Sequence, residues 1–353
     1  MRVAYYYSPR ERLSHDDPRN NPYGTLLAEA LERRGVEVEF ARDFDENYLR
    51  ANQRRVDVVH LNWLQLEYYD DDARAMSGRM RDFVDRLGLA RDLGYGLVWT
   101  AHNLYPHLRT HQSIDHEARL ATCRLATAVI AHCEVAADEV RRAFGRTSGL
   151  FVIPHGHFVG AYPDLYTREQ ARAALGVPDG AFVYGLFAGN LRPYKGIEHL
   201  IDTFRRLAGE DNWLVLSGGS KDAYGEALRA YADGHPRIAL RTYARAPSED
   251  VSLIMRAANA IVLPFVAATT SGTLILALSW AKPVVAPALG CLPETVDSAA
   301  GILYDPTEPD ALYRAMLAIR EREPDAASRA ALACAERLDW DDIAAKTVEA
   351  YRA

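Results

Sequence analysis

The sequence predicts an α/β protein with two doubly wound parallel sheets, each covered by helices on both faces. Two observations support this: short apolar runs alternate with segments of helical periodicity, and the alternation starts again after His155-Gly156-His157. Parallel strands need crossover helices, which produce such alternation. The length of 353 residues suits about two domains. We therefore expect a first domain over residues 1–158 and a second over residues 159–337.

The first domain is predicted from strands and helices that follow one another in short steps. The predicted strands cover residues 2–7, 36–40, 56–61, 97–101, 128–132 and 150–153. One helix is expected to be capped by Asn21, to have Pro22 at its first position and to end at Gly35, because proline suits a helix start and glycine a helix end. The other predicted helices cover residues 80–90, 118–127 and 136–144.

The second domain repeats this pattern after a connecting stretch with a helix at residues 162–175. The predicted strands cover residues 182–189, 213–217, 238–240, 260–265 and 283–286. The predicted helices cover residues 197–207, 226–234, 248–258 and 272–281. Ligands of such sheets bind beyond the carboxyl ends of the strands, so we expect the ligand site in a cleft between the two sheets.

Composition and charge disfavour several classes of protein. With 41 Lys+Arg against 48 Asp+Glu, the net charge is −7, which argues against a nucleic-acid partner. No run approaches the ~18–20 apolar residues of a membrane span, and the N-terminus lacks the pattern of a signal peptide. The four cysteines form no CxxC pair. We interpret them as reduced packing residues rather than metal ligands and expect a cytoplasmic protein.

A candidate phosphate-binding loop follows the first strand of the second domain. In FAGNLRPYKGIEHLIDTF, residues 187–204, the strand ends at Gly189, the loop carries Arg192 and Lys195, and Gly196 opens an amphipathic helix. Free N–H groups at a helix start, together with cations, bind anions and most often phosphate. A surface loop with two solvated cations is the alternative.

A second loop of this kind follows a later strand. In LPFVAATTSGTLILALSWAKPVVAP, residues 263–287, the strand and the helix are joined through Thr270, Ser271, Gly272 and Thr273. Glycine lets a ligand approach the backbone closely, and hydroxyl groups can donate to phosphate oxygens. Thr270 or Ser271 can equally act as a helix cap. Two such loops in one domain favour a single ligand with a diphosphate.

Taken in order, these windows resemble the GT-B-fold enzymes called glycosyl transferases group 1, which use nucleotide-sugar donors. The run G-x-x-R-P-Y-K-G followed by I-x-x-L-I-x-x-F is similar to their donor-phosphate loop. LGCLPETV, residues 289–296, resembles their G-G-x-P-E-x-V loop, and GILYDPTEPDAL the segment after it. LDWDDIAAKTVEAYR resembles the last helix, at about residues 338–353, which crosses back to the first domain. The resemblance implies two Rossmann-like domains, the first binding the acceptor and the second the donor.

The resemblance assigns roles in the donor site. Lys195 matches the lysine that holds the donor diphosphate. The family arginine directly follows the loop glycine, here Gly189, but this chain has Asn190 there, so we expect Arg192 to supply the charge.

The family's Glu-x7-Glu pair is absent. Its two positions fall on Ala268 and Leu276. The chain therefore resembles a divergent branch that uses Thr270-Ser271-Gly272 where others place the acidic pair, and the stereochemistry of transfer stays open.

Further donor-side residues follow from the same resemblance. Glu294 matches the glutamate of the P-E-x-V turn, where it would bind a sugar or ribose hydroxyl or else cap a helix. The nucleotide is expected to be bordered by Ser217, Gly218, Gly219, Tyr243 and Arg245. UDP is the more common nucleotide, followed by GDP. We expect no metal ion or other cofactor, since cationic side chains and helix dipoles offset the diphosphate charge in this fold.

Residues that follow strands of the first domain are candidates for the acceptor site. In VWTAHNLYPH, residues 98–107, His102 and Asn103 come just after a buried strand. An imidazole can accept a proton near neutral pH, and the family often has a functional histidine in this loop. A structural histidine bound to backbone is the alternative. Further candidates, for which core packing or a hinge role is also compatible, are His60, Asn62, Trp63, His155 and His157.

The sequence thus predicts a glycosyltransferase that moves a sugar from a nucleotide diphosphate sugar to a hydroxyl of a saccharide or glycolipid. Arg192 and Lys195 would stabilise the leaving diphosphate, and His102 would bind or deprotonate the acceptor. The alternatives are a nucleotide-sugar 2-epimerase and a non-catalytic nucleotide-sugar-binding protein.

One stretch is a candidate for contact with the inner face of the membrane. Residues 79–91 carry Met80, Phe83, Val84 and Leu87 between cations. Such a pattern suits either peripheral contact with anionic lipid or ordinary packing of a helix on the sheet.

Overall fold

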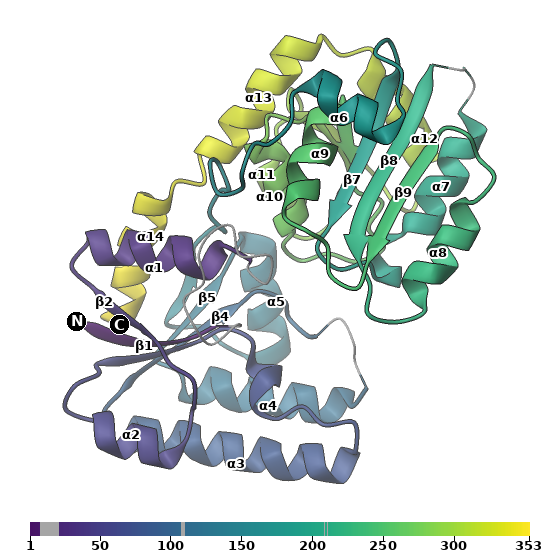
Figure 1. The fold of residues 1–353 in the computed structure, drawn as a ribbon. Helices are drawn as coiled ribbons and strands as arrows, with labels where there is room; N and C mark the ends of the chain where they lie inside the picture. Colours follow the sequence, from purple (N-terminus) through teal and green to yellow (C-terminus); the bar gives the residue numbers. More distant parts are fainter. Residues whose placement is uncertain (8–20, 107–109, 208, 210) are drawn as a thin grey trace. The chain divides into compact units, whose positions relative to one another are not determined.

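The computed structural model describes residues 1–7, 21–106, 110–207, 209 and 211–353. Within these ranges the chain divides into two compact units (Figure 1). The first unit comprises the residues up to Gly156 together with Leu338–Ala353, and the second comprises His157–Arg337. No helix in the described ranges is both long and apolar enough to cross a membrane.

A six-stranded parallel sheet in the order β2-β1-β3-β4-β5-β6 forms the centre of the first unit. Its strands are β1 (Arg2–Tyr6), β2 (Glu37–Phe40), β3 (Val58–Leu61), β4 (Gly96–Ala101), β5 (Ala128–Ala131) and β6 (Leu150–Val152). Its helices are α1 (Tyr23–Arg33), α2 (Glu46–Asn52), α3 (Ala73–Asp92), α4 (Gln112–Leu125), α5 (Glu134–Phe144), α14 (Trp340–Tyr351) and the 3₁₀ turn η1 (Leu64–Glu67). Helices α2 to α5 cover one face of the sheet, and α1 and α14 cover the other (Figure 1).

Strand alternation decides which side chains enter which core. Val59, Leu61, Leu97 and Trp99 pack into the core beneath α2 to α5. His60, between two of these residues, points to the opposite face and α14. This is the period of two expected for strands buried on both faces.

Helix α3 packs its apolar side on this core. Met80, Phe83 and Leu87 are buried there, and Val84 packs against it. These side chains are covered by the sheet and by neighbouring helices, so of the two alternatives for residues 79–91, ordinary packing of a helix on the sheet is the correct one for them.

The last helix, α14, belongs to the core of the first unit and lies beside α1 (Figure 1). The Trp340 ring meets the Tyr23 ring edge-on at 5.5 Å between centroids. The hydroxyl of Tyr351 lies 2.7 Å from Nδ1 of His60 in the middle of the sheet. A Cβ on Gly156 would overlap the Trp340 indole, so a small residue is needed there.

The second unit has the same architecture, with a parallel sheet in the order β12-β11-β10-β7-β8-β9. Its strands are β7 (Phe182–Ala188), β8 (Asn212–Gly219), β9 (Ile238–Tyr243), β10 (Ala260–Val262), β11 (Val284–Pro287) and β12 (Gly301–Tyr304). Its helices are α6 (Arg168–Leu175), α7 (Ile197–Arg206), α8 (Tyr224–Ala232), α9 (Glu249–Ala257), α10 (Gly272–Ser279), α11 (Leu292–Thr295), α12 (Ala311–Arg320), α13 (Pro324–Glu336) and the 3₁₀ turn η2 (Pro193–Lys195). Helices α7, α8 and α12 lie on one face, and α6, α9, α10 and α13 on the other (Figure 1). This confirms the predicted fold class in both halves.

Some local expectations need correction. Pro22 takes the cap position of α1 instead of its first turn, while Asn21 accepts a hydrogen bond from the Tyr23 N–H at 3.2 Å. The prediction of reduced cysteines is confirmed for Cys123 and Cys334, which are buried free thiols, and is wrong for Cys133 and Cys291, which are not free thiols.

Gly196 joins η2 to α7 at a point where another backbone passes very close. Its φ is +65°, in the left-handed region, and an added Cβ would overlap the carbonyl oxygen of Pro264 in the chain after β10. The close approach is reinforced by the Val266 N–H, which donates to the Tyr194 carbonyl at 2.8 Å. Only glycine satisfies both conditions without strain.

We predict that Gly196→Ala destabilises the protein by roughly 2–4 kcal/mol, since the change combines left-handed strain with a backbone clash. Gly176→Ala is the matched control, because Gly176 has a φ of +68° and no atom within 4 Å of an added Cβ. It should cost only about 1 kcal/mol. Denaturant-induced unfolding of both variants measures the difference, and equal losses would show that the clash with Pro264 is unimportant.

Candidate functional site

The strand order of the second sheet identifies the edge where a ligand is expected. The chain runs from β7 through β8 to β9 on one side, and β10 then pairs with β7 on the other side. Such a switch point opens a crevice beyond the carboxyl ends of its two strands. The loops that start after β7 and β10, residues 189–196 and 263–271, are the two phosphate-loop candidates, and they meet through Gly196 and Pro264.

Lys195 is buried at this point, although it lies on a loop. Its side chain is 8% exposed, and its ammonium lies 5.4 Å from the centroid of the Tyr194 ring and 5.2 Å from that of Phe265. The described residues give this ammonium no carboxylate partner. Burial lowers the pKa of Lys195 to about 8. A buried cation without a counter-charge is unfavourable by itself and suits a site in which a bound anion supplies that charge.

Arg192 lies on the same loop as Lys195, but its guanidinium is paired with a carboxylate. Its guanidinium donates to Asp222, just after β8, at 2.7 Å, and its side chain is 29% exposed. Asp222 is itself fixed by the Ser220 hydroxyl at 2.7 Å and the Tyr224 N–H at 3.2 Å. Arg192 is thus held at the rim of the loop by Asp222. Gly189 and Asn190, which precede it, are exposed.

The loop after β10 leads into the N-terminus of α10. Ser271 caps this helix by accepting a hydrogen bond from the Leu274 N–H at 3.1 Å, so the capping alternative is correct for this residue. Gly272 and Thr273 in the first turn are partly exposed. Their N–H groups precede the capped position and belong to the helix donors that lack intrahelical partners.

A third loop joins this edge through Gly290. Its φ is +51°, and an added Cβ would overlap the carbonyl oxygens of Ala268 and Thr269. The Cys291 N–H donates to Thr269 at 2.8 Å, and the Thr270 hydroxyl lies 3.5 Å from the Cys291 sulfur. The segment with Glu294 is thereby held against the loop after β10.

The positions of the missing glutamate pair differ in environment. Leu276 is buried in α10, and Ala268 lies on the partly exposed loop. Glu294 is exposed on the short helix α11.

The expected nucleotide border is only partly at the surface. Ser217 is completely buried, and its hydroxyl donates to Asp250 at 2.6 Å, so it does not line a ligand site as expected. Gly218 and Gly219 allow close passage of the chain after β7, since an added Cβ would meet its backbone. Tyr243 is half-buried and its hydroxyl accepts from Arg241 at 2.7 Å, while Arg245 is exposed.

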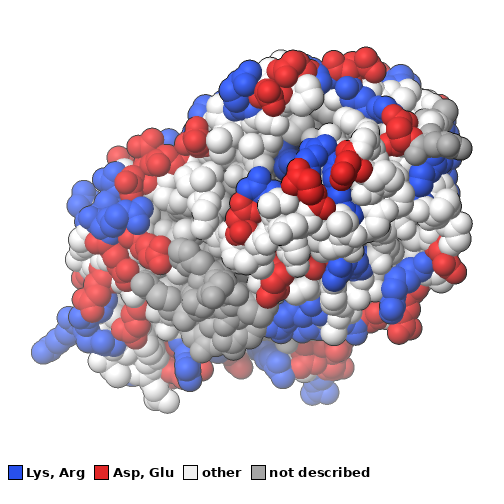
Figure 2. Space-filling model, turned by 45° about the horizontal axis from the view of Figure 1, so that its top comes forward, with Lys and Arg blue, Asp and Glu red and all other residues white. Residues whose placement is uncertain are grey.

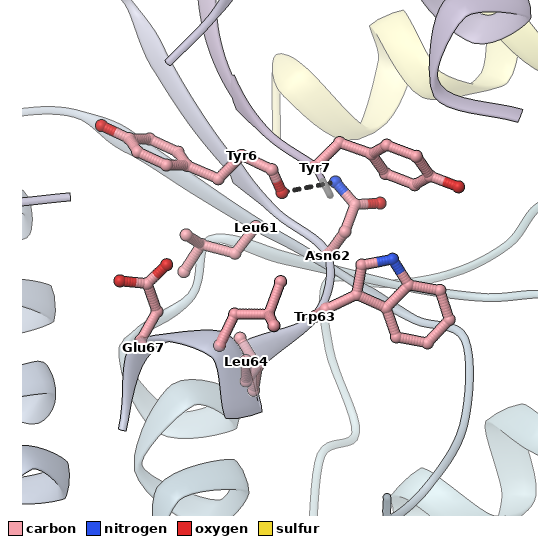
Figure 3. A pocket seen from close by; sticks show the side chains of 8 residues that line it. Tyr6, Tyr7, Leu61, Asn62, Trp63, Leu64 and Glu67 are labelled. Atoms are coloured by element: carbon pink, nitrogen blue, oxygen red, sulfur yellow. Dashed lines mark hydrogen bonds between the residues drawn. The ribbon is translucent and has the colours of Figure 1, made fainter. Parts of the chain in front are cut away.

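In the first unit, polar residues follow the carboxyl ends of neighbouring strands. Asn62 and Trp63 follow β3, and His102 and Asn103 follow β4. The Trp63 ring stacks on His102 with centroids 4.4 Å apart. Figure 3 shows the Asn62 amide reaching the Tyr6 carbonyl, at 3.1 Å, with the Trp63 indole close by.

Two small pockets open at this edge, and both are lined by Asn62, Trp63 and Leu64. His102 and Asn103 line the larger one. Arg119, which is 3% exposed, closes it with its guanidinium against the Tyr68 hydroxyl and the Asp115 carboxylate. This small pocket therefore combines aromatic surface with polar groups.

The other predicted acceptor residues lie elsewhere. His60 is inside β3, completely buried, and lies 2.7 Å from both Tyr351 and Thr100, so it is a core residue and not an acceptor-side one. His155 is buried, and its Nδ1 lies 2.8 Å from the Gly156 carbonyl. His157 belongs to the second unit, where its Nδ1 accepts from the Val159 N–H at 3.2 Å.

Burial keeps four histidines of the first unit neutral: His60, His102, His132 and His155. Desolvation lowers the pKa of His60 and of His155 to about 3 and that of His132 to about 4. The pKa of His102 lies well below its usual value for the same reason, with His132 acting in the same direction. At neutral pH these rings are therefore uncharged.

Surface charge is mixed on the face in view, and the described residues contain no cluster of metal-binding groups. On the face shown in Figure 2, described basic and acidic side chains are interspersed instead of forming one extended field. Nowhere in the described ranges do three or more His, Cys, Asp or Glu side chains gather as metal ligands would.

Sequence relatives decide the family. Residues 183–322 match the family described as Glycosyl transferases group 1. The chain is 30% identical over 282 residues to the GDP-mannose:glycolipid 4-beta-D-mannosyltransferase of Xanthomonas campestris pv. campestris, a match that covers 76% of this chain and 70% of the relative. This chain belongs to the group 1 glycosyltransferases. It is also similar to the D-inositol 3-phosphate glycosyltransferase of Corynebacterium jeikeium, at 26% identity over 90% of this chain and 88% of the relative.

Solved structures agree on the fold of this glycosyltransferase. The sucrose-phosphate synthase of Thermosynechococcus elongatus superposes with a TM-score of 0.73 at 20% identity, covering 100% of this chain and 98% of that one. Anabaena HepE in complex with UDP-glucose gives a TM-score of 0.73 at 18% identity over 99% and 98%. The GT-B fold predicted from the sequence is thus confirmed.

Several residues of these sites were not predicted from the sequence. Tyr194 and Phe265 enclose the Lys195 ammonium, and Asp222 holds Arg192. His132 bonds to His102 in the first unit. The sequence position of His132 could have identified it, because His132 directly follows the strand β5 just as His102 directly follows β4.

We predict that Lys195→Met raises the free energy of unfolding at pH 7 by up to about 3 kcal/mol, because it removes a buried ammonium whose pKa is lowered to about 8 by burial. The gain should shrink as pH rises from about 8 towards ~10.4, where the folded wild-type lysine is neutral and the unfolded one loses its proton. Unfolding in denaturant at pH 7 and pH 10 measures this.

Lys282→Met is the matched control. Lys282 has the same pKa of about 8, lowered by burial, but its ammonium donates to the Ala258 carbonyl at 3.0 Å. Its loss leaves that carbonyl without this donor, so no comparable stabilisation is expected. If both variants gain equally, the lack of a partner at Lys195 is not what destabilises the wild type.

Proposed function

We propose that this glycosyltransferase moves a sugar from a nucleoside diphosphate sugar to a hydroxyl of a saccharide or glycolipid. The second unit would hold the donor at the edge formed by the loops after β7 and β10. The first unit would hold the acceptor at the edge with Trp63 and His102. The observation that carries the proposal is the buried ammonium of Lys195, which has no carboxylate partner among the residues that the structure describes.

The charge of a leaving diphosphate is what Lys195 is suited to offset. In a site lined by Tyr194 and Phe265 the ammonium interacts with an anion far more strongly than in water. Gly272 and Thr273 would add backbone N–H donors at the start of α10. Arg192 would contribute from the rim, where Asp222 limits its reach. This arrangement requires no metal ion.

The relatives support this substrate class. The printed name of one relative specifies GDP-mannose and a glycolipid, and a structural neighbour was solved with UDP-glucose. The donor of this chain is therefore proposed as a nucleoside diphosphate hexose, with UDP expected ahead of GDP. The relatives are transferases, which favours transfer over the epimerase and binding-protein alternatives.

The absence of the glutamate pair changes what holds the sugar. With Ala268 and Leu276 at those positions, no carboxylate is available there to bind the donor sugar. We propose that donor positioning depends mainly on the diphosphate contacts and on Glu294. Loss of Lys195 should then impair turnover severely.

The proposal is tested with a panel of UDP, GDP and TDP and their common sugars. A ligand that binds only the native state raises the melting temperature, so the correct nucleotide should stabilise the wild type and not Lys195→Ala. Nucleoside diphosphate release in the presence of candidate acceptors then measures turnover. Full turnover by Lys195→Ala would overturn the donor-site assignment.

Donor binding should also take up protons. A diphosphate next to Lys195 raises the pKa of this lysine from about 8. At pH 8 about half of the lysines are unprotonated before binding, so up to about 0.5 proton should be taken up per nucleotide bound. Calorimetric titration in two buffers of different ionisation enthalpy measures this uptake.

Lys195→Arg is the control for this measurement. Arginine stays protonated in proteins, so this variant should bind nucleotide at pH 8 without proton uptake. Tight binding by the wild type without proton exchange would exclude contact between Lys195 and the diphosphate.

A further inference from the structure

Residues at or just after the carboxyl ends of β1, β3, β4, β5 and β6 form one hydrogen-bonded chain in the first unit. It runs from the Tyr6 carbonyl through Asn62, His102 and His132 to the Ile153 carbonyl. Asn62 Nδ2 lies 3.1 Å from the Tyr6 oxygen, and Asn62 Oδ1 lies 2.9 Å from His102 Nε2. His102 Nδ1 lies 3.0 Å from His132 Nε2, and His132 Nδ1 lies 3.0 Å from the Ile153 oxygen. Both ends are carbonyl oxygens, which only accept hydrogen bonds.

This chain needs three protons on two imidazole rings. The Tyr6 carbonyl takes the amide N–H of Asn62, so Asn62 presents its own oxygen to His102 Nε2. At the other end, the Ile153 carbonyl needs a proton on His132 Nδ1, and one more proton belongs between the rings. Two neutral imidazoles carry two protons. All links are therefore satisfied only when the pair carries one positive charge.

In the free protein the pair is neutral. Burial lowers the pKa of both rings, and among the described residues no carboxylate faces them. The groups around the two rings are Tyr7, Tyr23, Trp63, His155 and, within β3, His60. One link of the chain therefore lacks its proton.

When a link lacks its proton, two lone pairs face each other. At only one of the links can the opposed groups move apart. At Ile153 a bare nitrogen would face a backbone carbonyl that the sheet holds in place. Between the rings, two lone pairs would face each other in the packed interior. At His102 Nε2 the opposing group is the Asn62 amide, a side-chain group outside the sheet backbone that can turn away only by giving up its bond to the Tyr6 carbonyl. Both residues line the pocket beside Trp63.

We infer that His132 is a positioning residue, which fixes His102 as the Nδ1–H tautomer and leaves His102 Nε2 as the basic atom at the acceptor pocket. His132 does this by donating to the Ile153 carbonyl, which leaves its Nε2 to accept from His102. The arrangement orients an imidazole as a carboxylate does in other enzymes, but through a neutral partner.

The consequence for transfer rests on the proposed function. The acceptor hydroxyl donates to His102 Nε2, and its oxygen forms a bond to the anomeric carbon. The bond from that carbon to the diphosphate breaks, its electron pair leaves with the nucleoside diphosphate, and the hydroxyl proton passes to His102 Nε2. That proton is the third one of the chain, so its uptake completes every hydrogen bond. The stacked Trp63 ring stabilises the resulting cation.

The tautomer is tested directly by ¹⁵N NMR of histidine-labelled protein at pH 7. We expect His102 in the wild type to carry its proton on Nδ1 and to have a bare Nε2. His132→Phe removes the acceptor and should shift His102 to the Nε2–H tautomer, which donates to Asn62. His132→Gln, whose amide can accept from His102 and donate to Ile153, should keep the wild-type tautomer. A wild-type His102 protonated on Nε2 overturns the inference, even where a variant fails to fold.

Turnover separates this inference from the proposed function. With the donor found in the nucleotide panel, His132→Phe should lower kcat on the order of 10²-fold with little change in donor KM. His132→Gln should restore most of the loss. If the tautomers are as expected but His132→Phe and His102→Ala keep full turnover, the proposed role of His102 is wrong and the tautomer assignment stands. If both His132 variants lose turnover equally while His102 keeps its tautomer, His132 does not act through the tautomer.

Discussion

Parallel strand pairing brings every carboxyl end of a sheet to the same edge, and the chemistry of both units depends on it. In the first sheet Ala101, Ala131 and Val152 are paired in register, so the residues that follow them, His102, His132 and Ile153, come side by side. A slip of one residue in β5 would turn His132 to the opposite face. In the second sheet the same constraint brings the loops after β7 and β10 together, where Gly196 allows one backbone to pass against the other.

Burial acts in the same direction on the cationic groups at both edges, with different results. At Lys195 it leaves an ammonium to which no carboxylate of the described ranges is paired, so an anion is the favourable partner. At His102 and His132 it removes the charge and leaves a lone pair, so a hydroxyl proton is the favourable partner. One unit is thus suited to a leaving group and the other to a nucleophile. The results differ because at neutral pH a lysine with a pKa of about 8 keeps its proton, whereas a histidine with a pKa of about 4 does not.

The sequence predicted the elements better than the surroundings of their side chains. Short apolar runs and glycine-rich loops located both sheets, because parallel strands buried on both faces have this pattern. The burial of Lys195 could not be predicted, since Phe265 reaches it from the loop after β10, 70 residues later in the chain. His60 was misplaced because a residue inside a strand was treated as one at its end. Its place between Val59 and Leu61, which share one face, indicated the opposite face.

The passage of the C-terminal segment into the first unit has a consequence for biosynthesis. Residues 157–337 can assemble their own sheet and helices as soon as they leave the ribosome. The first unit lacks Trp340 against Tyr23, and Tyr351 beneath His60, until α14 has been made. During translation the part of the chain that emerges first is therefore completed last, and its exposed sheet face must remain soluble while the second unit folds.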